Sequence, residues 1–126
     1  MDLFNRSPKK PKPLSNKFLN KRKNTTEYTE ERLAKEFDGK KVKGSGCTGE
    51  KGDVSSDKLG YLIESKRTSN PVTSLHLKHL EKIEEEATSV GKKFLLVTTF
   101  LLTDIGKPKD YVTLSKADFM ELVGKV

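Results

Sequence analysis

The spacing of apolar residues along the chain predicts two long helices. Residues 25–39 begin with threonines that can cap a helix and end at a glycine, and residues 72–91 also end at a glycine. In both segments apolar residues recur every three or four positions, as on the buried face of a helix. These stripes consist of Tyr28, Leu33, Ala34 and Phe37 in the first segment, and of Leu75, Leu80, Ile83, Ala87 and Val90 in the second.

Shorter apolar runs predict strands between and after these helices. Residues 53–56 and 61–65 have strand composition and are joined by a turn at 57–60, and Val42 can form a short strand before them. The run KFLLVTTFLL at 93–102 is apolar at most positions, which is typical of a central strand buried on both faces.

The end of the chain predicts an edge strand over residues 110–114 and a short helix over 116–123, capped by Ser115. A helix that joins two strands favours a parallel crossover, so at least one strand pair should be parallel. The sequence therefore predicts an α/β fold in which a central mixed sheet is flanked by helices.

Charge divides the chain into two parts. Residues 1–24 contain eight basic side chains and one acidic side chain, so they account for the net charge of +7. With three prolines and little apolar periodicity, this segment is predicted to be a disordered basic arm, followed by one folded domain over residues 25–126. A basic arm suits phosphate backbones, although a solubilising tail and a nuclear-import signal are alternative interpretations.

Several classes of protein do not fit the sequence. It contains no apolar run of about 18 residues and no apolar region near Met1, so no membrane association is expected. Cys47 is the single cysteine, which excludes an internal disulfide and a multi-cysteine zinc site. His76 and His79 are interpreted as a surface pair, and the acidic run at 84–86 as the solvated face of its helix.

The most informative residues for function are Asp53, Glu64 and Lys66. Side chains alternate along a strand, so Glu64 and Lys66 share one face, and Asp53 begins the neighbouring strand. Two carboxylates held close together repel, so either one is protonated or a divalent cation neutralises both. Oxygen ligands favour Mg²⁺ or Mn²⁺, and an ion with a nearby lysine suits phosphodiester hydrolysis. The alternative is a solvated hairpin with an ordinary surface ion pair.

The segments EERLA, KGD and LIESK together resemble the PD-(D/E)xK nuclease superfamily, in particular archaeal-type and phage Holliday junction resolvases. The resemblance implies a restriction-endonuclease-like core and a Mg²⁺-dependent endonuclease that cuts four-way DNA junctions. It implies the catalytic residues Glu30, Asp53, Glu64 and Lys66, and metal ligation by Asp53, Glu64 and the main-chain carbonyl of Ser65. Glu27 and Glu31 are alternatives for the carboxylate of the first helix. Gly52 stands where the named motif has proline.

The resemblance and the basic, glycine-rich loop before Asp53 also predict a DNA-binding surface. Its candidate residues are Lys40, Lys41, Lys43, Gly44, Ser45, Gly46, Lys51, Arg67 and Thr68. Matched cuts on two opposing strands require two sites, which predicts a homodimer. A cytoplasmic location in a bacterium or a phage-infected cell is expected. The alternative functions are a nuclease for nicked, flapped or mismatched DNA, and a non-catalytic nucleic-acid-binding protein.

Overall fold

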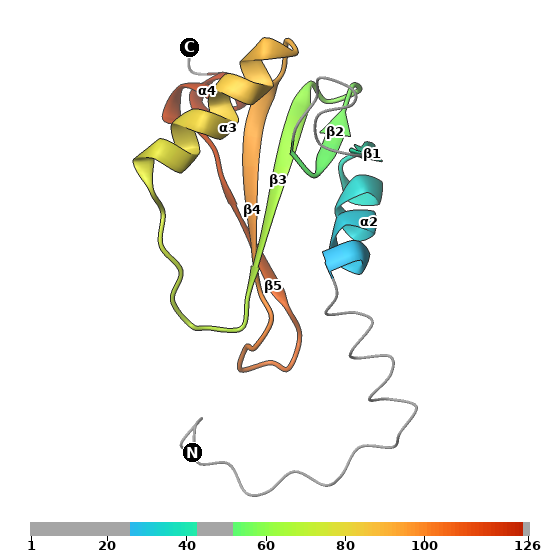
Figure 1. Ribbon diagram of the computed structural model, residues 1–126, viewed down its shortest axis with the longest axis vertical. Helices are drawn as coiled ribbons and strands as arrows, with labels where there is room; N and C mark the ends of the chain where they lie inside the picture. The colour runs from blue at the N-terminus through green and yellow to red at the C-terminus, as the bar shows by residue number, and fades with distance from the viewer. Residues whose placement is uncertain (1–25, 43–51, 125–126) are drawn as a thin grey trace, which may run out of the picture.

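A computed structural model describes residues 26–42 and 52–124 of the chain (Figure 1). The described helices are α2 (Thr26–Glu36), α3 (Leu77–Ser89) and α4 (Lys116–Leu122), and the strands are β1 (Lys40–Lys41), β2 (Val54–Ser56), β3 (Tyr61–Thr68), β4 (Lys93–Phe100) and β5 (Lys109–Thr113). The strands form one sheet in the order β1-β2-β3-β4-β5. Strands β3 and β4 are parallel, and the other neighbours are antiparallel. This arrangement confirms the predicted α/β class with a mixed sheet.

The sheet has a core on each face because β3 and β4 alternate their side chains between two helices. On one face Leu33 of α2 packs with a cluster that includes Ile63 and Val97. On the other face Ile83 and Ala87 of α3 pack with a cluster that includes Leu62, Phe94 and Leu96. Strand β4 is buried from Phe94 to Thr99, which confirms that it is a central strand. Among the described residues, no helix is long and apolar enough to cross a membrane.

An ion-pair network fixes α2 against the far strand of the sheet. Arg32 donates from Nη1 to Oδ2 of Asp110 at 2.6 Å and from Nη2 to Oδ1 at 3.1 Å. Thr99 on β4 donates its hydroxyl to Oδ1 of Asp110 at 2.6 Å. These contacts and the burial of Leu33 hold α2 in one orientation, and therefore hold the polar side chains that α2 presents near β2 and β3.

The second helix begins five residues later than predicted, at Leu77. Residues 72–76 are not helical, and Leu75, which was expected in the apolar stripe, is 57% exposed. The β-branched Val72 and Thr73 are weak helix formers, and this segment has to span the distance from the end of β3 to α3. The end of the helix was predicted correctly, because Gly91 adopts a φ of +73° there.

The remaining differences concern boundaries. Helix α2 ends at Glu36, ahead of the predicted Gly39, because Asp38 already leaves the helical region with a φ of 52°. Strand β1 lies directly before Val42, and β3 extends three residues beyond its predicted end at Ser65. Ser115 caps α4 as predicted, since its Oγ accepts the N–H of Asp118 at 3.1 Å.

Position 39 requires glycine, because the chain there lies too close to β2 to leave room for a side chain. A Cβ atom at this position would lie 2.7 Å from the carbonyl oxygen of Ser55 and 3.0 Å from a methyl carbon of Val54. The first distance is below normal contact and involves backbone, which cannot move aside without disturbing the pairing of β1 with β2. Any side chain at position 39 therefore pushes the end of α2 away from the sheet.

We expect Gly39→Ala to lower the free energy of unfolding by about 2–3 kcal/mol, as overpacking against backbone does. Gly60→Ala is the control, because Gly60 has a φ of +77° but open space around it. That control should lose only the cost of a left-handed alanine, about 1 kcal/mol. Urea denaturation of both variants measures the difference. A smaller loss for Gly39→Ala than for Gly60→Ala would contradict the proximity argument.

Candidate active site

Asp53 is held at the start of the β2–β3 hairpin by three hydrogen bonds. Its N–H donates to the carbonyl of Ile63 at 3.0 Å, and its own carbonyl accepts the N–H of Val42 at 3.0 Å. Its side-chain Oδ2 accepts the N–H of Ser65 at 2.6 Å. The Asp53 carboxylate therefore lies against β3, directly beside the residue that follows Glu64.

The residue before Asp53 is Gly52, and its backbone conformation is one that proline cannot adopt. It adopts a φ of +94°, whereas the ring of proline fixes φ near −65°. A Cβ at this position would also lie 3.1 Å from Cγ of Leu62. The departure from the named motif is thus a requirement of the local backbone in this chain.

Three carboxyl groups from different elements meet at Asp53, and we call Glu30, Asp53 and Glu64 the carboxyl cluster. Burial, then the charge of Asp53, then a hydrogen bond with Asp53 raise the pKa of Glu30 above its usual value. Burial, followed by the charges of Asp53 and Glu86, raises the pKa of Glu64 to about 7. The structure thus brings together the three predicted carboxylates. Of the glutamates considered in α2, Glu30 lies beside Asp53, while Glu27 and Glu31 are exposed.

Cationic side chains surround this cluster. The charges of Lys41 on β1 and Arg67 on β3 act to lower the pKa of Glu30, and Lys82 on α3 does the same for Glu64. Arg67 donates from Nη2 to the hydroxyl of Thr26 at 2.8 Å, which ties β3 to the start of α2. The positive charges of these three side chains therefore partly offset the negative charge of the carboxyl cluster.

Sequence reasoning missed Glu86 and Lys82. Glu84 and Glu85 are exposed as predicted, but Glu86 is half-buried and its charge acts on Glu64, so its assignment to the solvated face was wrong. The signal was its position three residues after the buried Ile83 and directly before the buried Ala87. Lys82 is one helical turn before Glu86, so it lies on the same side of α3.

Lys66 has a different partner from the one predicted. Its Nζ donates to the main-chain carbonyl of Ser74 at 3.0 Å, in the segment before α3. Thr68, also predicted to contact DNA, accepts the N–H of Asn70 at 3.0 Å, and Lys40 is exposed on β1. Outside the described residues lie the predicted DNA contacts Lys43, Gly44, Ser45, Gly46 and Lys51, together with Cys47 and the basic arm.

The donor atoms of the carboxyl cluster suit a hard divalent ion. Within residues 26–42 and 52–124, no three Asp, Glu, His or Cys side chains are arranged to hold a metal ion as they stand. Instead, Asp53 accepts the N–H of Ser65, and its charge raises the pKa of both glutamates. Protonation of Glu30 or Glu64 relieves the repulsion in this arrangement. Mg²⁺ would relieve the same repulsion through the all-oxygen donors it prefers.

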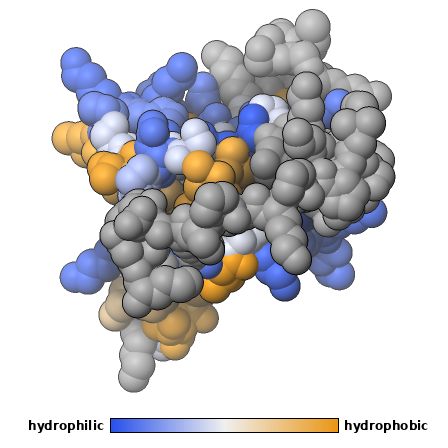
Figure 2. Space-filling view, turned by 90° about the horizontal axis from the view of Figure 1, so that it is seen from below, coloured by the Kyte–Doolittle hydropathy of each residue, from blue (hydrophilic) through white to orange (hydrophobic). Residues whose placement is uncertain are grey.

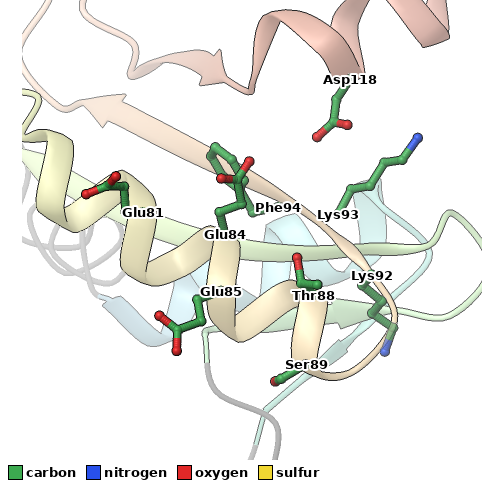
Figure 3. A pocket seen from close by; sticks show the side chains of 9 residues that line it. All are labelled: Glu81, Glu84, Glu85, Thr88, Ser89, Lys92, Lys93, Phe94 and Asp118. Carbon is green, nitrogen blue, oxygen red and sulfur yellow. The ribbon is translucent and has the colours of Figure 1, made fainter.

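A separate hollow lies beside α3, α4 and the start of β4 (Figure 3). It is lined by Glu81, Glu84, Glu85, Thr88, Ser89, Lys92, Lys93, Phe94 and Asp118. Its two lysines are in ion pairs, Lys92 with Asp57 at 2.8 Å and Lys93 with Glu121 at 2.5 Å. The remaining carboxylates give the hollow an unfavourable charge for a polyanion, in contrast to the cation-rich surroundings of the carboxyl cluster.

The raised pKa of Glu64 predicts a pH-dependent loss of stability. The unfolded chain releases this proton near pH 4.5, whereas the folded chain keeps it up to about pH 7. The free energy of unfolding should therefore fall as the pH rises from about 4.5 to 7 and change little above. Glu64→Gln should reduce this decline to the part that Glu30 contributes, and it should be the more stable protein at pH 8. Because Glu64 is partly exposed, we expect the free energy of unfolding of Glu64→Gln at pH 8 to exceed that of the unmodified chain by only about 1 kcal/mol.

Chemical denaturation at pH 4.5, 6 and 8 measures this effect. Glu84→Gln is the matched control, because Glu84 is exposed on the same helix that carries Glu86. Its profile should follow that of the unmodified chain. Parallel pH profiles for the unmodified chain and Glu64→Gln would show that Glu64 titrates normally.

Comparison of the chain with models of protein families gives no match, and searches of curated proteins and of solved structures give none either. The geometry of the carboxyl cluster and its cations is therefore the basis for a functional assignment.

Proposed function

We propose that this chain is a Mg²⁺-dependent, structure-selective DNA endonuclease that resolves four-way junctions by hydrolysing phosphodiester bonds. The observation that carries the proposal is that the Asp53 carboxylate lies close enough to those of Glu30 and Glu64 for its charge to raise the pKa of both. The mixed α/β sheet supports the proposal, because the β2–β3 hairpin is followed by the crossover helix α3 and the parallel strand β4.

Each group in the proposed site has a distinct role. Asp53, Glu64 and the Ser65 carbonyl would hold the ion, which when bound supplies an activated water and offsets charge on the phosphate. Lys66, once released from Ser74, would place its ammonium against the scissile phosphate. Lys41, Arg67 and Lys82 lie around the cluster and would contact neighbouring phosphates.

The test is cleavage of a labelled synthetic four-way junction with Mg²⁺, with Mn²⁺ and with a chelator. We expect cutting in either ion and none with the chelator. The Lys66→Ala variant should bind the junction but not cut it, and full activity in this variant would end the proposal. Flapped and nicked duplexes run in parallel distinguish a junction resolvase from a nuclease for other DNA structures. Sedimentation of the chain with the junction tests for the homodimer that paired cuts require.

The contact between Lys66 and Ser74 also favours a second candidate, a non-catalytic nucleic-acid-binding protein. The proposed catalytic ammonium already donates to the backbone carbonyl of Ser74, a contact that would have to break before it could act on a phosphate. This alternative predicts junction binding that survives chelation, with no cleavage in any divalent ion. The same set of reactions therefore separates the two functions.

A further inference from the structure

Strand β5 leaves one edge of the sheet open. It is the last strand in the order β1-β2-β3-β4-β5, so among the described residues it pairs with β4 alone. Every residue from Lys109 to Val112 is exposed, including Tyr111 at 57% and Val112 at 48%. An open edge with exposed residues of high strand propensity is a surface to which another strand can add.

The hydrogen bonds of β4 show which backbone groups of β5 point away from the sheet. The N–H groups of Lys93 and Leu101 both donate to carbonyls on the β3 side of β4. Backbone groups point alternately to the two sides of a strand, so the even-numbered residues of β4 bond their register partners on β5, among them Tyr111. The N–H and C=O groups of Asp110 and Val112 on β5 therefore point outward.

These outward backbone groups fit a second copy of the same strand. In an antiparallel pair centred on Tyr111, Asp110 of each copy lies opposite Val112 of the other, and all the outward groups of both residues are paired. Pro108, directly before β5, has no N–H. A pair centred on Asp110 would place Pro108 opposite Val112 and lose hydrogen bonds. The edge is therefore self-complementary in the register centred on Tyr111.

The aromatic side chain at the centre of this register also suits the pairing. Tyr111 packs against Phe100 of β4 in an edge-to-face arrangement, with ring centroids 6.0 Å apart. More than half of Tyr111 is nevertheless exposed. In the pair centred on Tyr111, the two Tyr111 side chains would lie directly opposite each other, and such aromatic pairs stabilise antiparallel strands.

The charges of β5 do not oppose this pairing. Its two charged residues are Lys109, which would face Thr113 of the second copy, and Asp110, which would face Val112. Asp110 is also bound to Arg32 of its own chain at 2.6 Å. Like charges therefore do not lie opposite each other within the paired strands. The segments that flank β5 carry charges of both signs, Asp104 and Lys107 before it and Lys116 and Asp118 after it.

Exposed apolar side chains alone do not locate an interface in this chain, because they occur on several elements. Figure 2, for example, shows hydrophobic residues among hydrophilic ones at the end of the molecule that is seen from below. Strand β5 differs from these places because it also presents a row of outward backbone groups, which pair best with another strand.

We propose that β5 is the interface of a homodimer, in which it pairs antiparallel with β5 of a second copy, centred on Tyr111, and joins the two sheets into one of ten strands. The choice of a second copy rests on the proposed function, which needs two sites, but the pairing does not depend on cleavage. Opposite residues of antiparallel strands share a face, so both Glu64 side chains would lie on the same face of the joined sheet. The two β3 strands would be about 24 Å apart across it.

Disulfide crosslinking tests the register. Tyr111→Cys is made in a Cys47→Ser background, so that each chain carries a single thiol. In the proposed pair the two Cα atoms at position 111 would be about 4.5 Å apart, which a disulfide can span. Val112→Cys in the same background is the matched control, because Val112 is similarly exposed. The two Cα atoms at position 112 would be about 8–9 Å apart, which is too far for a disulfide.

With oxidised glutathione we expect more than about half of the Tyr111→Cys chains to be crosslinked as dimers, and fewer than about a tenth of the Val112→Cys chains. Equal crosslinking of the two variants would overturn the inference, because it would indicate random collisions. Absence of a crosslink in Tyr111→Cys would overturn it as well.

Sedimentation of the full chain without DNA tests the hydrogen bonds. The unmodified chain should be a dimer. Val112→Pro removes an N–H that points away from β4, so β5 should stay paired within its own chain while the dimer loses two hydrogen bonds. We expect the dissociation constant of the dimer to rise about 30-fold. Val112→Ala keeps the N–H and should change this constant by less than about fivefold.

Equal effects of proline and alanine at position 112 would overturn the inference. Circular dichroism checks that Val112→Pro is folded, and if it is not, the crosslinking experiment decides. A chain that stays monomeric at every concentration would also overturn the inference, and it would assign the open edge to a strand of a different protein.

These outcomes are separable from those of the proposed function. A dimer that forms through β5, in a chain that never cuts DNA, would support this inference and remove the enzymatic assignment. Mg²⁺-dependent cutting by a chain whose dimer does not involve β5 would do the reverse.

Discussion

Asp53→Asn is expected to abolish junction cleavage while leaving junction affinity within about twofold of the unmodified chain. Asparagine has nearly the same shape, and its side-chain oxygen can still accept the N–H of Ser65, so the hairpin should keep its structure. It lacks the negative charge that, together with Glu64 and the Ser65 carbonyl, would hold a divalent ion. Removal of one such group should lower the single-turnover rate by about 10³-fold or more.

This variant also has a readout that needs no DNA. Loss of the Asp53 charge should lower the pKa of both Glu30 and Glu64, so the folded variant should be the more stable protein at pH 8. Asp57→Asn is the matched control, because Asp57 is an exposed aspartate in the turn of the same hairpin. If the single-turnover cleavage rate of Asp53→Asn were within tenfold of that of the unmodified chain, Asp53 would have no catalytic role. Unchanged stability at pH 8 would show that the three carboxyl groups do not interact.

Removal of residues 1–24 is expected to lower DNA affinity strongly and to flatten its dependence on salt. This segment carries the net positive charge of the chain, in eight basic side chains against one acid. For every phosphate that the truncated chain no longer neutralises, the slope of log affinity against log salt should fall by about 0.9. If several phosphates are involved, binding should weaken at least about 100-fold at low salt. Titrations at four salt concentrations determine both quantities.

A full-length chain in which the eight basic residues are replaced by glutamine is the control for the length of the arm. It should behave like the truncated chain if charge is responsible. Single-turnover cleavage at saturating protein should change much less than affinity, because the proposed site lies in the folded domain. An unaltered salt slope after truncation would show that these residues do not contact the DNA backbone.

The fold was predictable where short-range patterns determine it. Strand β4 is apolar along its length, and the hairpin of β2 and β3 is fixed by a four-residue turn, so both were located correctly. The start of α3 was not predictable, because apolar residues continue at helical spacing through Leu75 into a segment that serves as a connection. The conformation of that segment depends on the position of the end of β3 relative to α3. The pattern of apolar residues along the chain carries no information about that position.

The same distinction applies to the site. Asp53 and Glu64 are neighbours through strand pairing, so the hairpin alone was enough to place them together. Glu86 and Lys82 approach Glu64 only because α3 crosses β3 on that face of the sheet. The partner of Lys66 depends on the path of the connection after β3. Contacts between distant elements therefore account for the parts of the site that the sequence did not reveal.

The hydrogen bond from the Ser65 N–H to Asp53 links correct folding of the hairpin to the integrity of the carboxyl cluster. If β2 slipped by one residue along β3, this donor would be lost and the side chains of the β2 segment would exchange faces, which would carry the Asp53 side chain away from Glu64. A misaligned hairpin would thus be inert rather than active with altered selectivity. For a protein proposed to cut branched DNA, misfolded copies would therefore leave DNA intact.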